Sequence, residues 1–143
     1  MNNAKHMAVH MLTRRHVDKN RDVVMFDIDD TLLRPWTSEP IHEMIELHHA
    51  ARLLGYRIII MTARPETDWN VVNTAKQLRS HGIVPTELLF VPASKKSDVK
   101  RELGHKYNFV LSVGDKLTDL GESMYWLKLP DDNDLQIRSN LYV

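Results

Sequence analysis

The chain has 143 residues, of which 43% are hydrophobic and 27% are charged, so it is large enough for one globular domain and is neither wholly disordered nor collagen-like. Nineteen basic residues balance nineteen acidic ones, so no overall field draws the protein to a nucleic-acid backbone or an anionic membrane. Because cysteine is absent, a disulfide framework, a thiolate metal site and a thiol nucleophile are excluded as well.

The first 21 residues precede the first predicted strand and are expected to form an N-terminal arm or a short helix. Basic and histidine side chains interrupt this segment, so it lacks the apolar run of a secretory signal. No later stretch has the roughly 18 apolar residues that a membrane-spanning helix needs. We therefore expect a soluble, cytoplasmic protein with no membrane partner.

From residue 22 to residue 130, short β-branched or apolar runs alternate with segments of helical periodicity, a pattern typical of βαβ units. We predict one α/β core over these residues, built on a parallel sheet. The second run is apolar at three consecutive positions, as a strand buried on both faces requires. The five predicted strands are 23–27, 57–61, 88–91, 109–113 and 125–129.

Three predicted helices connect these strands. The first begins near Pro40, a residue favoured at the first helical position, and ends at Gly55. The second covers residues 68–80 and the third covers residues 97–103, each followed within two residues by a glycine that can end a helix. Residues 131–143 are predicted to be a surface tail.

Acidic residues follow the first predicted strand, in the run Asp27-Ile28-Asp29-Asp30-Thr31. Residues two apart on an extended chain point the same way, so Asp27 and Asp29 can face one small volume at the carboxyl end of the strand. Open α/β sheets bind their ligands at this edge. Two close carboxylates favour a bound cation or a shared proton. The pair suits phosphoryl transfer, with Asp27 attacking phosphorus and Asp29 passing a proton to the leaving oxygen.

Further polar residues are expected at the same edge of the sheet. Thr62 follows the second strand and could hold a phosphoryl oxygen. Asp115 and Asp119 follow the fourth strand, and their carboxylates are oxygen ligands of the kind that Mg²⁺ takes. A lysine at the start of the third helix, Lys95 or Lys96, could neutralise charge on a transferring phosphoryl group.

Each of these features alone has a plain structural explanation. Aspartate and threonine are common in turns and helix caps, and lysines usually lie on the solvated surface. The joint pattern favours a site, because Asp-x-Asp-x-Thr, Thr, Lys and Asp-x-x-x-Asp come in that order and three of them directly follow apolar strands.

These four motifs resemble those of the haloacid dehalogenase (HAD) superfamily of phosphohydrolases, over residues 23–130. Within it, the runs Phe-Asp-Ile-Asp-Asp-Thr-Leu-Leu, Thr-Ala-Arg-Pro-Glu, Lys-Ser, Gly-Asp and Lys-Leu-Pro are most similar to the class B acid phosphatase branch, subfamily IIIB. The Lys-Ser pair favours Lys96 as the third-motif lysine, while Lys95 stays open. The resemblance implies a three-layer, Rossmann-like fold whose five-stranded parallel sheet has the order 5-4-1-2-3.

The resemblance also implies a covalent mechanism that depends on Mg²⁺. Asp27 would form an aspartyl-phosphate, and Asp29 would protonate the leaving alcohol and then activate water. The predicted metal ligands are Asp27, the main-chain carbonyl of Asp29, Asp115 and Asp119.

The substrate-binding residues implied by the resemblance come from the second and third motifs and from the loop after the first. Residues 31–40 have room only for a short flap, and residues 62–96 hold one helix and one strand, so we expect an enzyme without a cap domain. Trp36 in this flap is a candidate for stacking on a flat group, with simple packing as the alternative. The predicted substrate-binding residues are Trp36, Thr62, Ala63, Arg64 and Lys96.

The leading prediction is therefore a Mg²⁺-dependent phosphomonoesterase that acts on a phosphorylated small molecule or a nucleotide. One alternative is an end-processing enzyme like the 3′-phosphatase domains joined to polynucleotide kinases, since an open site admits phosphorylated nucleic-acid ends. Another is a phosphate-binding module without catalysis. The oligomeric state is left open.

Overall fold

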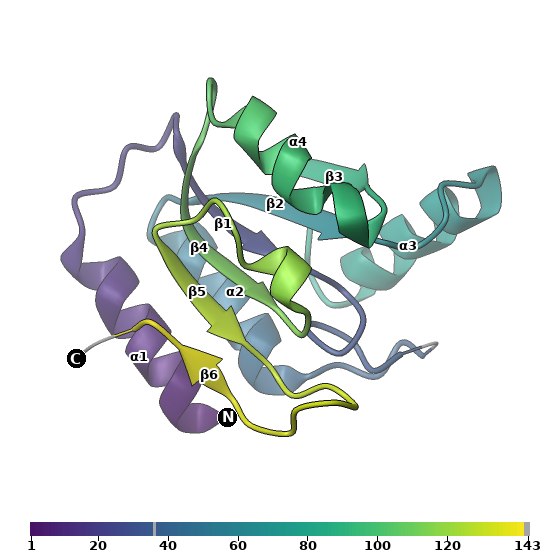
Figure 1. The fold of residues 1–143 in the computed structure, drawn as a ribbon, viewed down its shortest axis with the longest axis horizontal. Helices are drawn as coiled ribbons and strands as arrows, with labels where there is room; N and C mark the ends of the chain where they lie inside the picture. The colour runs from purple at the N-terminus through teal and green to yellow at the C-terminus, as the bar shows by residue number, and fades with distance from the viewer. Residues whose placement is uncertain (36, 142–143) are drawn as a thin grey trace.

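The apolar runs predicted as strands lie side by side in the centre of the molecule (Figure 1). The computed structural model describes residues 1–35 and 37–141. The strands are β1 (Asp22–Phe26), β2 (Arg57–Thr62), β3 (Glu87–Phe90), β4 (Asn108–Gly114), β5 (Tyr125–Lys128) and β6 (Arg138–Ser139). The α-helices are α1 (Asn2–Arg14), α2 (His42–Leu53), α3 (Asp68–Ser80) and α4 (Lys96–Leu103), and two 3₁₀ helices are η1 (Ala93–Lys95) and η2 (Leu117–Asp119).

The sheet has the order β3-β2-β1-β4-β5-β6, and its first five strands are parallel. This order confirms the predicted arrangement of five strands. The sixth strand corrects the prediction, because β6 lies in the presumed tail and pairs antiparallel with β5. Two residues are too few to show the alternation that marks a strand in a sequence. The side chain of Asn140 continues this edge by accepting a hydrogen bond from the backbone N–H of Trp126 at 2.8 Å.

Helices cover both faces of the sheet and complete the three layers. One apolar cluster joins α1, α2 and Leu78 of α3 to strand residues such as Phe26, and a second joins α4 to residues such as Met25. Alternate residues of β1 therefore point to opposite layers, as a doubly covered strand requires. No helix in the described ranges is long and apolar enough to span a lipid bilayer.

The N-terminal segment forms a helix, the second of the two forms expected for it. Ala4, Ala8 and Leu12 are buried at a spacing of four residues and join the cluster on the α2 side of the sheet. The hydroxyl of Tyr56 donates a hydrogen bond to the carbonyl of Leu12 at 2.8 Å and fixes the end of the helix. Two of these three buried residues are alanines, whose small side chains give only a weak hydrophobic pattern. The sequence therefore did not distinguish a helix from an arm.

The connections that could carry a cap domain are short. A backbone hydrogen bond from Ile41 to Leu32 closes the segment that contains the flap, and Leu33 forms an isolated bridge with Pro40. Pro40 therefore pairs with Leu33 and does not begin the helix. The helix α2 begins at His42, two residues later than expected. Only α3 lies between β2 and β3. The described residues of both connections thus contain no inserted domain, as predicted.

The register of the central strands sets the height of their carboxyl ends. Phe26 of β1 lies opposite Ile60 of β2 and Val113 of β4. The backbone N–H of Asp27 continues this pairing by donating to the carbonyl of Val113 at 3.0 Å. The residues that follow β1, β2 and β4 therefore meet at one edge of the sheet.

Candidate active site

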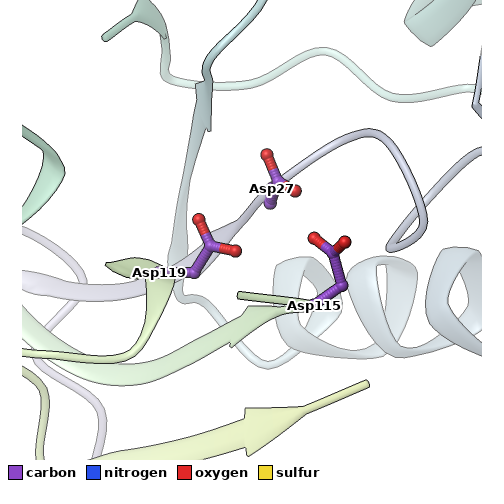
Figure 2. Close-up of side chains that lie close together, drawn as sticks. All are labelled: Asp27, Asp115 and Asp119. Atoms are coloured by element: carbon purple, nitrogen blue, oxygen red, sulfur yellow. The ribbon is translucent and has the colours of Figure 1, made fainter. Parts of the chain in front are cut away.

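Three buried carboxyl groups meet at the carboxyl edge of the sheet. Asp27 follows β1, Asp115 follows β4, and Asp119 ends η2. One carboxylate oxygen from each lies within 4.8 Å of the other two, and Figure 2 shows the three groups around a common volume. The structure thus brings together three of the predicted metal ligands, and we refer to them as the acidic triad.

The acidic triad requires a compensating positive charge. Burial raises the pKa of Asp27 well above its usual range, and the nearby carboxylate of Asp119 adds to this effect while Lys96 opposes it. Burial likewise raises the pKa of Asp115. A proton, an ammonium group or a metal cation would each relieve the repulsion. The donor set consists of carboxylate oxygens, which hard divalent cations such as Mg²⁺ prefer.

Lys96 supplies an ammonium group from the first residue of α4. Its Nζ donates to Oδ1 of Asp27 at 3.1 Å and to Oδ1 of Asp119 at 2.6 Å, and only 2% of the residue is exposed. Burial alone would lower the pKa of Lys96, but the two carboxylates raise it, so the side chain stays cationic at neutral pH. Lys95 is exposed at the end of η1, and it is Lys96 that points into the site.

Asp119 is held in place by main-chain and lysine contacts that sequence reasoning missed. The backbone N–H of Lys116 donates to its Oδ2 at 3.1 Å. The buried Nζ of Lys100 donates to its carbonyl oxygen at 2.8 Å and to the hydroxyl of Ser112 at 2.9 Å. A Cβ on Gly114 would overlap the Asp119 side chain. The four-residue spacing from Lys96 places Lys100 on the same helix face, which was the available signal.

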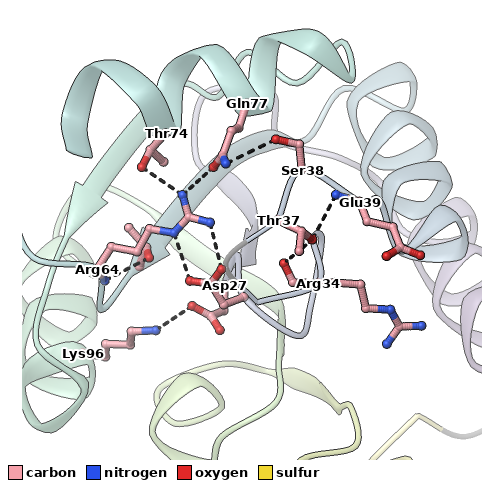
Figure 3. Close-up of polar contacts among 11 residues, drawn as sticks. Asp27, Arg34, Thr37, Ser38, Glu39, Arg64, Thr74, Gln77 and Lys96 are labelled. Atoms are coloured by element: carbon pink, nitrogen blue, oxygen red, sulfur yellow. Dashed lines mark hydrogen bonds and ion pairs between the residues drawn. The ribbon is translucent and has the colours of Figure 1, made fainter. Parts of the chain in front are cut away.

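Asp29 lies outside the acidic triad and pairs with Arg64. The Nε and Nη2 atoms of Arg64 donate to the two carboxylate oxygens at 2.9 and 2.8 Å. Its Nη1 donates to Oγ1 of Thr74 at 3.1 Å and to Oε1 of Gln77 at 2.7 Å, both on α3 (Figure 3). Sequence reasoning placed Arg64 among the substrate-binding residues but identified neither its ion pair nor its partners on α3.

Thr62 and Ala63 form the exit of β2 beside this pair. The hydroxyl oxygen of the buried Thr62 accepts a hydrogen bond from the backbone N–H of Arg64 at 3.2 Å. Ala63 is exposed and lines the same pocket as Thr62. This placement leaves the Thr62 hydroxyl proton free to donate to an oxygen in the pocket.

The site opens into a pocket of about 560 Å³, a size suited to a small molecule. Asp27, Asp29 and Lys96 line this pocket, and α3 contributes lining residues that include Trp69, which is 73% exposed. The proposed contribution of Trp36 lies outside the described residues.

Comparison with known proteins identifies the family. The sequence pattern of the HAD superfamily, subfamily IIIB (acid phosphatase), matches residues 34–133 of the chain. The chain belongs to this family. The predicted resemblance to this branch is thereby confirmed over residues 34–133. The matched range begins after Asp27 and Asp29, so their place in the site rests on the geometry described above.

This member of the family is also similar to the uncharacterized protein At2g39920 of Arabidopsis thaliana, with 27% identity over 125 residues. The alignment covers 80% of this chain and 43% of the plant protein, so the chain spans less than half the length of that relative. HAD proteins generally use a divalent metal, and the acidic triad could hold such an ion.

Proposed function

We propose that the chain is a Mg²⁺-dependent phosphomonoester hydrolase that works through an aspartyl-phosphate on Asp27. The observation that carries this proposal is the position of the Asp27 carboxylate, which lies close to two further buried carboxyl groups and 3.1 Å from the ammonium of Lys96, at an accessible pocket. The family supports phosphatase chemistry in general. The arrangement of Asp27 supports the nucleophilic route.

In the first step, a carboxylate oxygen of Asp27 attacks phosphorus. The bond from phosphorus to the leaving oxygen breaks, its electron pair goes to that oxygen, and the carboxyl group of Asp29 donates a proton to it. In the second step, water attacks the phosphorus of the aspartyl-phosphate and gives a proton to the Asp29 carboxylate. The phosphorus bond to Asp27 then breaks, which restores the carboxylate of Asp27 and the acid form of Asp29.

Other residues of the site stabilise charge and position the phosphoryl group. The Thr62 hydroxyl and the Lys96 ammonium are proposed to bind phosphoryl oxygens, where charge accumulates in the transition state. Asp27, Asp115, Asp119 and the main-chain carbonyl of Asp29 are proposed to hold Mg²⁺. When bound, Mg²⁺ supplies positive charge that offsets the repulsion between the phosphoryl oxygens and the nucleophile.

The test is a substrate panel assayed with Mg²⁺ and with a chelator. Nucleoside monophosphates, sugar phosphates, p-nitrophenyl phosphate and a 3′-phosphorylated oligonucleotide would distinguish small-molecule substrates from nucleic-acid ends. We expect Mg²⁺-dependent release of phosphate that is lost in Asp27→Asn. The asparagine side chain has nearly the shape of aspartate, but its amide oxygen is a poor nucleophile. Wild-type activity in that variant would refute the nucleophile, and phosphate binding without turnover of any substrate would favour a binding module.

A further inference from the structure

The guanidinium of Arg64 is largely committed to protein partners. Two of its N–H groups bind Asp29, and two bind the side chains of Thr74 and Gln77. Arginine has five N–H groups, so one remains for a substrate once the contacts with the described residues are counted. The main contacts of Arg64 are therefore with the proposed proton donor on one side and with α3 on the other.

The two partners on α3 fix the plane of the guanidinium. Thr74 and Gln77 are three residues apart and therefore lie on one helix face, which is turned toward Arg64 (Figure 3). Thr74 is 1% exposed, so its position is set by the core. Because a bidentate pair keeps guanidinium and carboxylate nearly coplanar, fixing the plane of Arg64 also fixes the carboxylate of Asp29.

A second hydrogen bond orients the Gln77 amide. Its Nε2 donates to the hydroxyl of Ser38 in the flap at 3.3 Å, which leaves Oε1 facing Arg64. The same flap residue is held again from the end of α3, where Nε2 of His81 lies 2.8 Å from the carbonyl oxygen of Ser38. The acceptor end of Gln77 is thus directed at the guanidinium by contacts on both sides.

We propose that Gln77 is a positioning residue for proton transfer by Asp29 and acts through Arg64. The inference rests on the proposed phosphatase function. Without the Gln77 oxygen, the Thr74 hydroxyl is the one acceptor that the described residues leave for Nη1 of Arg64, and the guanidinium and the carboxylate can rotate together. A general acid must lie within hydrogen-bond reach of the oxygen it protonates, so a small rotation of Asp29 weakens its contribution.

A misplaced proton donor changes the relative rates of two substrates that differ in their leaving group, whereas a general defect in the pocket does not. The anion of p-nitrophenol is stable and leaves with little help, whereas the alkoxide from glycerol 2-phosphate needs a proton as the phosphorus bond breaks. The ratio of kcat/KM for these two substrates therefore reports on Asp29. A structural defect in the pocket lowers both values together and leaves the ratio unchanged.

The experiment compares this ratio in the wild type, Gln77→Leu and Gln77→Glu. We expect Gln77→Leu to lower kcat/KM for glycerol 2-phosphate about tenfold more than for p-nitrophenyl phosphate, a part of the roughly 10²-fold or larger effect of a general acid. Gln77→Glu keeps an acceptor for Arg64 and should restore the ratio. Lys76→Gln, at the neighbouring exposed position of α3, is the matched control and should leave both values unchanged.

An unchanged ratio in Gln77→Leu, or a Gln77→Glu variant that fails to restore it, would overturn the inference. Gln77→Met has the length of glutamine without its acceptor and replaces Gln77→Leu if the latter does not fold. Wild-type turnover and its loss in Asp27→Asn are measured alongside. A wild type that turns over neither these two substrates nor any other member of the substrate panel contradicts the proposed function, whereas an active wild type with an insensitive ratio contradicts only the role of Gln77.

Discussion

The ammonium of Lys96 and the carboxylate of Asp119 form an ion pair at 2.6 Å in which both side chains are almost completely buried. Breaking a buried pair leaves the remaining charge without compensation, and at this site Asp27 loses the same partner. We expect Lys96→Met to lower the free energy of unfolding at neutral pH by about 3–5 kcal/mol, measured by urea denaturation without added metal. Lys96→Met should also abolish phosphatase activity.

Lys95→Met is the matched control, because it removes the same charge at the neighbouring, exposed position. We expect it to change the free energy of unfolding by no more than about 0.5 kcal/mol, as is usual for surface substitutions. Equal losses in both variants would mean that the ion pair does not account for the stability of the site.

Mg²⁺ should stabilise the folded chain through the acidic triad. A ligand that binds only the folded state adds about 2.7 kcal/mol at a concentration 100 times its Kd. We expect the melting temperature to rise with Mg²⁺, and Asp115→Asn to weaken the apparent affinity at least about tenfold because a charged oxygen ligand is lost. Melting curves over a Mg²⁺ titration measure both effects.

Glu102→Gln controls for the loss of one acidic charge, since Glu102 is exposed on α4 away from the triad. Its Mg²⁺ response should match that of the wild type. The same shift in Asp115→Asn and Glu102→Gln would indicate that Mg²⁺ acts on the general charge of the protein and not at the triad.

The convergence of the site could be predicted from the sequence because parallel strands end at a shared edge. Asp27, Thr62 and Asp115 each directly follow or end an apolar run, so their meeting follows from the sheet alone. The choice between Lys95 and Lys96 needed the structure. A single turn of 3₁₀ helix ends at Lys95 and α4 begins at Lys96. Neighbouring residues at this junction point in different directions, so the local backbone decides which lysine side chain enters the site.

The contacts of Arg64 could not be predicted in the same way. They depend on the face that α3 turns toward the exit of β2, and this face is set by the packing of Leu78 against the core. The pattern of α3 showed an amphipathic helix but not its rotation relative to Asp29. Pairings between elements that depend on such a rotation are visible only in the folded chain.

Gly114 is predicted to be essential for the position of Asp119. A Cβ at this residue would overlap the Asp119 side chain, which cannot retreat because it is buried and bound to Lys96. We expect Gly114→Ala to cost about 1–3 kcal/mol of folding free energy, as overpacking does, and to lower kcat at least about tenfold. Urea denaturation and steady-state kinetics measure the two effects.

Gly104→Ala is a suitable comparison, because its Cβ would meet a main-chain oxygen at 3.1 Å and lies at the end of α4, outside the pocket. This variant should keep the kcat of the wild type. A fully active Gly114→Ala enzyme would show that Asp119 tolerates displacement and that the site does not depend on its close approach.

His48 should make the protein less stable in acid. The residue is fully buried on α2 beside Phe26, and neither ring nitrogen has a hydrogen-bond partner among the described residues. Burial, with smaller contributions from His49 and Arg52, lowers the pKa of His48 to about 4 from its usual 6.5. The unfolded chain binds this proton more tightly, so its contribution is present above about pH 6.5 and is lost as the pH falls toward 4.

We expect His48→Leu to retain more of its neutral-pH stability than the wild type at pH 4, with a difference of about 2–3 kcal/mol in the change between pH 7 and pH 4. Asp27 and Asp115, whose pKa values are raised by burial, are present in both proteins, so their contributions cancel in this comparison. Urea denaturation at the two pH values measures the change. His105→Gln removes an exposed histidine and should follow the wild type; parallel losses in all three proteins would assign the acid sensitivity to groups other than His48.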